Sequence, residues 1–159
     1  MTQAEPMLVA ARHDQRLLIE NLIQLYLYDM TSFMPFPVGL DGRFEYDFLD
    51  RFWRHPYLIM VGDEIAGFAL VVDECPLTGR QPCWFMAEFF VLAAYRRRGV
   101  ARQTLGAALA RHFGDWHIAV PLANTPALAF WSSVLDTRKP SIRQLNFEGD
   151  DWRLQAFST

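Results

Sequence analysis

The run FFVLAAYRRRGVA at residues 89–101 decides the fold, because in it an apolar strand passes through a basic turn into a helix. Residues 84–92 are apolar except for Glu88, which predicts a central strand that is buried on both faces. The expected faces are Trp84, Met86 and Phe90 on one side, and Phe85, Phe89 and Val91 on the other. A helix is expected over residues 100–113, with Gly114 as its stop.

The turn between this strand and this helix has the composition of a phosphate site. The first amides of a helix lack intrahelical acceptors and carry partial positive charge, so they can bind phosphate oxygens. Gly99 lets the backbone approach a phosphate closely, and Ala101 is small for the same reason. Arg96, Arg97 and Arg98 can add charge-assisted hydrogen bonds. A solvated basic connection would show the same short pattern, but the flanking strand and helix favour phosphate binding. The spacings of Rossmann and Walker loops are absent.

The remaining sequence predicts a mixed α/β sheet with helices on its faces. The expected order is one strand, two helices, three antiparallel strands, a helix, a strand, a helix and two strands. The strands are expected at residues 7–11, 57–61, 65–72, 84–92, 116–120, 142–147 and 152–157. The helices are expected from 13 or 14 to 29, and at 46–53, 100–113 and 125–134, with an apolar loop at 31–42.

Composition limits the classes of function. The 159 residues are 52% apolar and suit one domain spanning 1–159. The net charge of -3 and pI of about 5.8 argue against nucleic acid as a partner. No apolar run is long enough for a membrane helix, and no secretion signal is visible, so we expect a cytoplasmic protein without membrane association. Cys75 and Cys83 flank a loop and are expected to be reduced thiols rather than a metal site or a disulfide.

Two segments carry a resemblance to a known family. RRRGVA at residues 96–101 matches the pattern Gln/Arg-x-x-Gly-x-Gly/Ala, and NTPALAFW at 124–131 resembles Asn-x-x-Ala-x-x-Phe-Tyr. Together with the strand order, they make the chain similar to the GNAT superfamily of N-acetyltransferases. The resemblance implies a mostly antiparallel sheet, flanked by helices on both faces, that splays open between residues 84–92 and 116–120. Acetyl-CoA would lie in that opening.

The resemblance also implies the cofactor contacts. The pantetheine arm would pair with the backbone of Phe90 and Val91, and Asn124 would contact the same arm. The pyrophosphate would lie on Arg96, Arg97, Arg98, Gly99, Val100 and Ala101. Trp131 occupies the position of a tyrosine that protonates the leaving thiolate in many members. Because an indole is a donor without usable acidity, Trp131 is expected to wall the cofactor site instead.

Glu88 is the candidate general base, since burial in an apolar strand raises a carboxyl pKa. In part of the family a glutamate on this strand has that role. The alternative is that Glu88 pairs with an arginine or only orients the substrate. Tyr28 and Asp29, at the end of the first long helix, lie where the family binds the acceptor. Tyr26 is expected to pack in the core.

The expected function is transfer of an acetyl group from acetyl-CoA to a primary amine of a small molecule or peptide, by direct attack in a ternary complex. No metal is implied, and a homodimer is possible because dimers are common among relatives. One alternative is a non-catalytic acyl-CoA-binding regulatory module. A second alternative is a small-ligand or interaction domain that binds no CoA.

Overall fold

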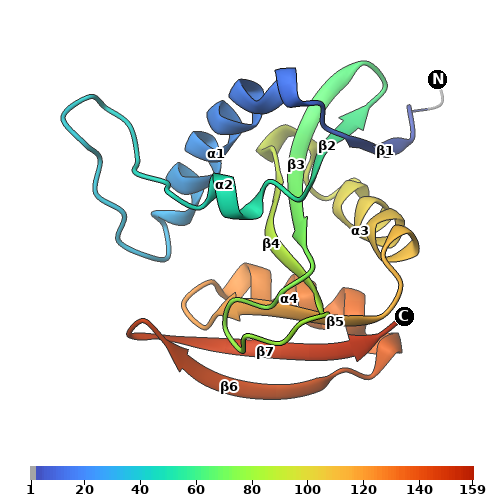
Figure 1. The fold of residues 1–159 in the computed structure, drawn as a ribbon. Helices are drawn as coiled ribbons and strands as arrows, with labels where there is room; N and C mark the ends of the chain where they lie inside the picture. Colours follow the sequence, from blue (N-terminus) through green and yellow to red (C-terminus); the bar gives the residue numbers. More distant parts are fainter. Residues whose placement is uncertain (1–2) are drawn as a thin grey trace.

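Seven strands form one sheet in the order β1-β2-β3-β4-β5-β7-β6 (Figure 1). The structure is a computed structural model that describes residues 3–159. Neighbouring strands are antiparallel except β4 and β5, which are parallel. The predicted mixed, mostly antiparallel sheet is therefore confirmed. The strands are β1 (Pro6–Ala10), β2 (His55–Val61), β3 (Glu64–Val72), β4 (Trp84–Val91), β5 (Asp115–Pro121), β6 (Ser141–Phe147) and β7 (Asp150–Ser158).

Helices cover both faces of this sheet, as expected. The α-helices are α1 (Arg16–Met30), α2 (Leu49–Phe52), α3 (Val100–Arg111) and α4 (Thr125–Leu135), and the short 3₁₀ helices are η1 (His13–Gln15), η2 (Ala93–Tyr95) and η3 (Asp136–Arg138). Apolar residues of α1 and α2 form one core with the sheet, and those of α3 and α4 form a second core on the opposite face. Within residues 3–159, none of the helices has both the length and the hydropathy to cross a membrane.

The sheet opens between β4 and β5. Only two residue pairs join these strands, Trp84 with Trp116 and Phe85 with His117, although the strands contain 8 and 7 residues. The far edge of β5 is paired over its whole length with β7. The strands therefore separate after their first contact, and the predicted splay lies at the expected place.

A β-bulge at Ala87 precedes Glu88. Glu88 faces Leu70 of β3 and Met86 faces Val71, which leaves Ala87 without a counterpart. The extra residue shifts the alternation of side chains, so the faces expected from a regular strand are wrong beyond this point. Met86, Phe89 and Val91 contribute to the core under α3 and α4, and Phe85 and Phe90 to the core under α1.

The helix expected over residues 46–53 is shorter than the sequence indicated. Only one turn, α2, is present, and residues 45–48 before it form neither helix nor strand. The side-chain amide of Gln24 on α1 hydrogen-bonds both the N–H and the carbonyl of Phe44, at 2.8 and 2.9 Å. Both peptide groups of Phe44 are therefore satisfied by a side chain, and this fixes the chain just before the start of the expected helix.

Cys75 and Cys83 are free and buried in the core under α1. Burial raises the pKa of the Cys83 thiol to about 11, which keeps it protonated and unreactive near neutral pH. That both cysteines stay reduced remains a prediction.

We predict that Gly67→Ala lowers the free energy of unfolding by about 3 kcal/mol or more, as overpacking does in rigid surroundings. A Cβ on Gly67 would lie 2.0 Å from the carbonyl oxygen of Phe90, a backbone atom that cannot rotate away. The control is Gly106→Ala on α3, where a Cβ meets nothing within 4 Å, and which should stabilise by about 0.5–1 kcal/mol. Chemical denaturation measures both, and equal small effects would contradict the prediction.

Candidate active site

A cavity of about 400 Å³ lies at the opening between β4 and β5. We call it the splay cavity. Its walls come from α1, the segment before α2, β4, β5, α4 and the hairpin between β6 and β7. Glu88, Trp131 and Asn124, three residues predicted for the site, all line it. The topology therefore brings together candidates that are up to 43 positions apart in the sequence, from Glu88 to Trp131.

Glu88 is half-buried in the wall of this cavity, so its carboxylate is surrounded by protein yet accessible from the cavity. The hydroxyl of Tyr46 donates a hydrogen bond of 2.9 Å to Glu88 Oε1. Burial raises the pKa of Glu88 to about 7, and hydrogen bonds from Tyr26 and Tyr46 oppose that rise. The carboxyl group thus titrates near neutral pH, where a general base is most effective.

The two tyrosines act as donors rather than as bases. Burial, followed by the charge of Glu88, raises the pKa of both Tyr26 and Tyr46 well above that of a free phenol. Both therefore stay protonated near neutral pH. Tyr26 also packs edge-on against Phe68 and at a tilt against Phe90. The predicted packing role of Tyr26 is confirmed, and its contact with Glu88 is an addition that the sequence did not indicate.

The turn before α3 has the backbone of an anion site. Gly99 caps the helix with φ 76°, and Arg97 also has a positive φ of 60°. A left-handed arginine costs on the order of 1 kcal/mol, so the surrounding structure must hold the turn in this shape. The first intrahelical bond runs from Gln103 to the carbonyl of Gly99, which leaves the amides of residues 100–102 without helical acceptors. A Cβ on Gly99 would meet nothing within 4 Å, so space for an anion exists there.

Arg96 is engaged within the protein. Its Nε donates to the carbonyl of Val91 at 2.8 Å, and its two terminal nitrogens contact the carboxylate of Asp29 at 3.0 and 3.4 Å. The guanidinium also lies 5.5 Å from the ring centre of Phe90. A residue predicted for phosphate binding is thus bonded to one predicted for acceptor binding. Of the three arginines, Arg97 and Arg98 have no ion pair among the described residues.

Comparison with known sequences identifies the family. The profile of the acetyltransferase (GNAT) family matches residues 22–135, which include the turn, Glu88 and α4. The chain belongs to the GNAT family. No curated protein sequence shows a significant match.

Solved structures of GNAT proteins share the fold. An acetyltransferase from Thermus thermophilus superposes with a TM-score of 0.67 at 16% identity, covering 100% of both chains. Spermidine N-acetyltransferase from Vibrio cholerae, solved with CoA and spermine, has a TM-score of 0.65 at 13% identity, covering 97% of this chain and 95% of that one. A putative acetyltransferase from Salmonella typhimurium, solved with acetyl-CoA, has a TM-score of 0.61 at 10% identity, with coverages of 96% and 93%. At these identities the likeness shows the fold alone.

Asn124 and Trp131 hold the α4 side of the splay cavity. The side-chain oxygen of Asn124 caps α4 by accepting from the amide of Ala127 at 3.2 Å, and its nitrogen lies 3.4 Å from the sulfur of Met30. Trp131 is buried and meets Phe89 edge-on, with ring centres 5.6 Å apart. Trp131 therefore forms a rigid aromatic wall beside β4.

Tyr28, predicted to bind the acceptor, lies outside this arrangement. It is 71% exposed on α1 and is not among the residues that line the splay cavity. The residue that reaches Glu88 instead is Tyr46, which sequence reasoning missed. It lies 42 positions before Glu88 in a segment that was expected to be helical, and no local pattern marks it.

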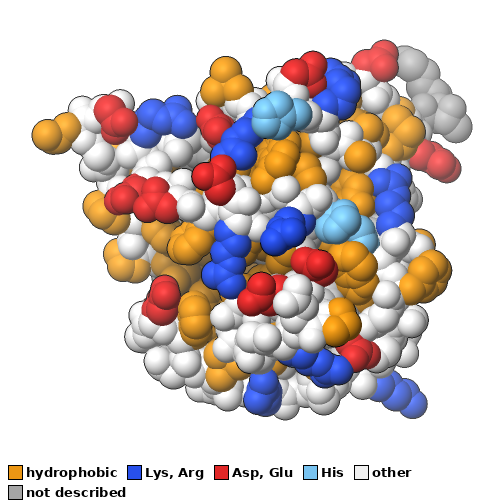
Figure 2. Space-filling model, in the orientation of Figure 1, with side chains coloured by type: hydrophobic (Ala, Val, Ile, Leu, Met, Phe, Trp, Pro, Cys, Tyr) orange, Lys and Arg blue, Asp and Glu red, His pale blue; other side chains and the backbone are white. Residues whose placement is uncertain are grey.

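Acidic and basic side chains are interspersed on the face shown in Figure 2. The lining of the splay cavity is more acidic, with four carboxylates, Glu45, Glu88, Glu148 and Asp150, and one arginine, Arg51. Among residues 3–159 there is no group of three or more His, Cys, Asp or Glu side chains that could hold a metal ion.

We predict that Glu88→Gln removes part of the pH dependence of stability. Because the folded-state pKa of Glu88 is raised to about 7, the native protein holds this proton more tightly than the unfolded chain, and wild-type stability falls as pH rises from about 5 to 8. Relative to wild type, the free energy of unfolding of the variant should increase over this pH range, by about 3 kcal/mol at most. The control is Glu45→Gln, an exposed carboxylate on the same cavity. Parallel pH profiles for Glu88→Gln and wild type, from urea denaturation, would contradict the prediction.

Proposed function

We propose that this protein is an N-acetyltransferase that moves an acetyl group from acetyl-CoA to a primary amine, by direct attack in a ternary complex. The observation that carries the proposal is the half-buried carboxylate of Glu88, with a pKa raised to about 7, in a cavity at the open edge of β4. The GNAT family provides the reaction class. The neighbours solved with CoA, acetyl-CoA and spermine support the choice of cofactor and of an amine.

Glu88 would accept the proton that the acceptor must lose. An alkylammonium has a pKa near 10, so it needs a base before its nitrogen can attack. The nitrogen then bonds to the thioester carbonyl carbon, the carbon–sulfur bond breaks, and the sulfur leaves as a thiolate. Tyr46 and Tyr26 keep the carboxylate oriented by donating to it. The free amides on the splayed edge of β4 would hold the developing oxyanion.

The turn would hold the cofactor through the amides of residues 100–102 and the left-handed Gly99. Arg97 and Arg98 provide charge there, together with Arg96 if it exchanges its bonds to Val91 and Asp29. Phe90 and Val91 of β4 and Asn124 of α4 would meet the pantetheine arm. Trp131 would close the side of the cavity against water. No acidic group lies at its position, and a thiol pKa near 8.5 makes the thiolate a workable leaving group without one.

The acceptor is proposed to be a cationic amine on a small molecule or peptide. Four carboxylates and one arginine line the splay cavity, and that arginine, Arg51, lies 3.8 Å from Glu74. The excess of negative charge attracts ammonium groups and repels acids. Asp29 is paired with Arg96 and does not line the splay cavity, so it would attract the acceptor from outside the cavity.

The whole chain is proposed to act as one domain. The family profile ends at residue 135, but β7 pairs with β5 over seven positions and so belongs to the same sheet. Two free cysteines suit the reducing environment of the cytoplasm, where we propose that the protein acts. A homodimer stays a prediction.

We predict that Gly99→Glu abolishes acetyl-CoA binding, because the new carboxylate would occupy and repel the phosphate position. Gly79→Glu is the matched control. Both glycines have positive φ, 76° and 70°, and a Cβ on either meets nothing within 4 Å, so the backbone strain is equivalent. Isothermal titration calorimetry should show no binding for Gly99→Glu and wild-type affinity for Gly79→Glu. Equal affinity in both variants would rule out this turn as the cofactor site.

We predict that Glu88→Gln lowers kcat by about 10²–10⁴, the usual loss when a general base is removed. Its affinity for acetyl-CoA should stay unchanged, because the substitution is isosteric and distant from the turn. Release of free CoA, followed with a panel of polyamines and peptides, measures the rate. A Glu88→Gln enzyme within about threefold of wild type would assign Glu88 to structure rather than to proton transfer.

A further inference from the structure

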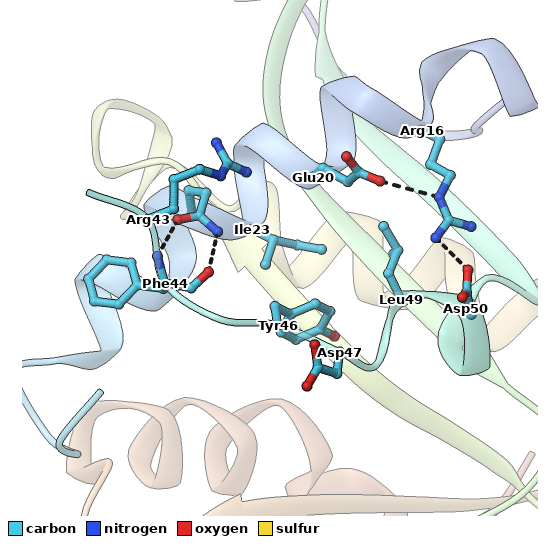
Figure 3. A pocket seen from close by; sticks show the side chains of 10 residues that line it. Arg16, Glu20, Ile23, Arg43, Phe44, Tyr46, Asp47, Leu49 and Asp50 are labelled. Atoms are coloured by element: carbon cyan, nitrogen blue, oxygen red, sulfur yellow. Dashed lines mark hydrogen bonds and ion pairs between the residues drawn. The ribbon is translucent and has the colours of Figure 1, made fainter. Parts of the chain in front are cut away.

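A second cavity, of about 420 Å³, is lined by Tyr46 and by side chains of α1 (Figure 3). We call it the α1 cavity. It lies under the first turns of α1, and Tyr46 lines both this cavity and the splay cavity. The lining residues are Arg16, Glu20, Ile23, Gln24, Arg43, Phe44, Tyr46, Asp47, Leu49 and Asp50. Tyr46 is thus the wall shared by a polar surface cavity and the proposed active site.

Gln24 fastens the segment that carries Tyr46. Its side-chain nitrogen donates to the carbonyl of Phe44 at 2.9 Å, and its side-chain oxygen accepts from the amide of Phe44 at 2.8 Å. One side chain thereby satisfies both peptide groups of one residue, as a neighbouring strand would. The second contact that orders this segment is an isolated bridge between Val38 and Phe44.

Tyr46 follows Phe44 by two residues and donates to Glu88 Oε1 at 2.9 Å. A chain of contacts therefore runs from α1 through Gln24, Phe44 and Tyr46 to the carboxylate on β4. A hydrogen bond to the charged form of a carboxyl group lowers its pKa, and the bond from Tyr46 has this effect on Glu88. The position of the segment thus affects how readily Glu88 gives up its proton.

We propose that Gln24 is a positioning residue for Glu88, acting through Phe44 and Tyr46 without touching the reacting atoms. Its double bond to Phe44 holds the Tyr46 hydroxyl at the carboxylate and so sets the proton affinity of the base. The activity consequence rests on the proposed function, but the effect on the Glu88 carboxyl group does not. Tyr26 on α1 also acts on that carboxyl group. The remaining charged groups that line the same cavity are Glu45 before α2, Arg51 on α2, and Glu148 and Asp150 at the β6–β7 hairpin.

The test is the titration of Glu88, followed by NMR of carboxyl-labelled glutamate, with Glu88→Gln used to assign the signal. Gln24→Met keeps the length of the side chain but loses both hydrogen bonds. It should raise the pKa of Glu88 toward the value in Tyr46→Phe, which lacks the hydroxyl. Asn21→Leu, an exposed amide on the same helix with no hydrogen-bond role among the described residues, is the control and should leave the titration unchanged. Gln24→Glu keeps the acceptor for the Phe44 amide and should give a smaller rise.

Activity separates this inference from the proposed function. If the pKa of Glu88 rises by about one unit, its deprotonated fraction at pH 7 falls roughly fivefold, and kcat should fall with it while KM for acetyl-CoA stays constant. The acid limb of the pH–kcat profile should move by the same interval. An unchanged Glu88 titration in folded Gln24→Met or Gln24→Glu, alongside a shift in Tyr46→Phe, would overturn the inference. A shifted titration with an unaltered pH–kcat profile would support the positioning role and contradict Glu88 as the base.

Discussion

The unpaired edge of β4 is the constraint on which the rest of this structure depends. Backbone N–H and carbonyl groups in a protein interior need partners, so the open edge of a central strand must be satisfied by side chains, water or a bound ligand. After Phe85 the neighbouring strand turns away, and the splay cavity fills the space. β5 nevertheless stays within a continuous sheet, because its other edge is paired with β7 along its whole length. The splay cavity forms where the pairing of β4 with β5 ends after two residue pairs.

A second feature of β4 places a charge beside this edge. The bulge at Ala87 changes which face the following side chains occupy, so Glu88 lies on the α1 side together with Phe90, whose ring packs against Tyr26. Without the extra residue, Glu88 would share a face with Met86 instead. The apolar surroundings that stabilise the strand are the same ones that raise the carboxyl pKa. Stability and proton affinity thus come from one packing arrangement.

Local sequence patterns correctly predicted the elements of the fold that are determined by residues close together in the chain. An apolar run identified β4, and a helical pattern after Gly99 identified α3. The phosphate site at the arginine-rich turn between them stays a prediction. The predictions that were wrong concern features that depend on residues far away in the sequence. Tyr46 was assigned to a helix because nothing near it shows that Gln24, twenty positions before Phe44, binds the backbone two residues ahead of Tyr46. The bulge was missed for a similar reason, since it appears only as a mismatch in register between β3 and β4.

Arg96 shows why composition alone misjudges a basic turn. Three successive arginines suggest three equal charges for a phosphate, yet the first is bonded to Asp29 and to the carbonyl of Val91. That pair joins the end of α1 to the end of β4 and so ties α1 to the turn. Because a bidentate pair is geometrically specific, it also fixes the direction in which β4 enters the turn. The strained φ of Arg97 follows one residue later, where the chain must reverse to present the amides of α3. Arg96 thus shapes the turn through its bonds to Val91 and Asp29. Within the described part of the chain, Arg97 and Arg98 are the arginines of this turn that form no ion pair.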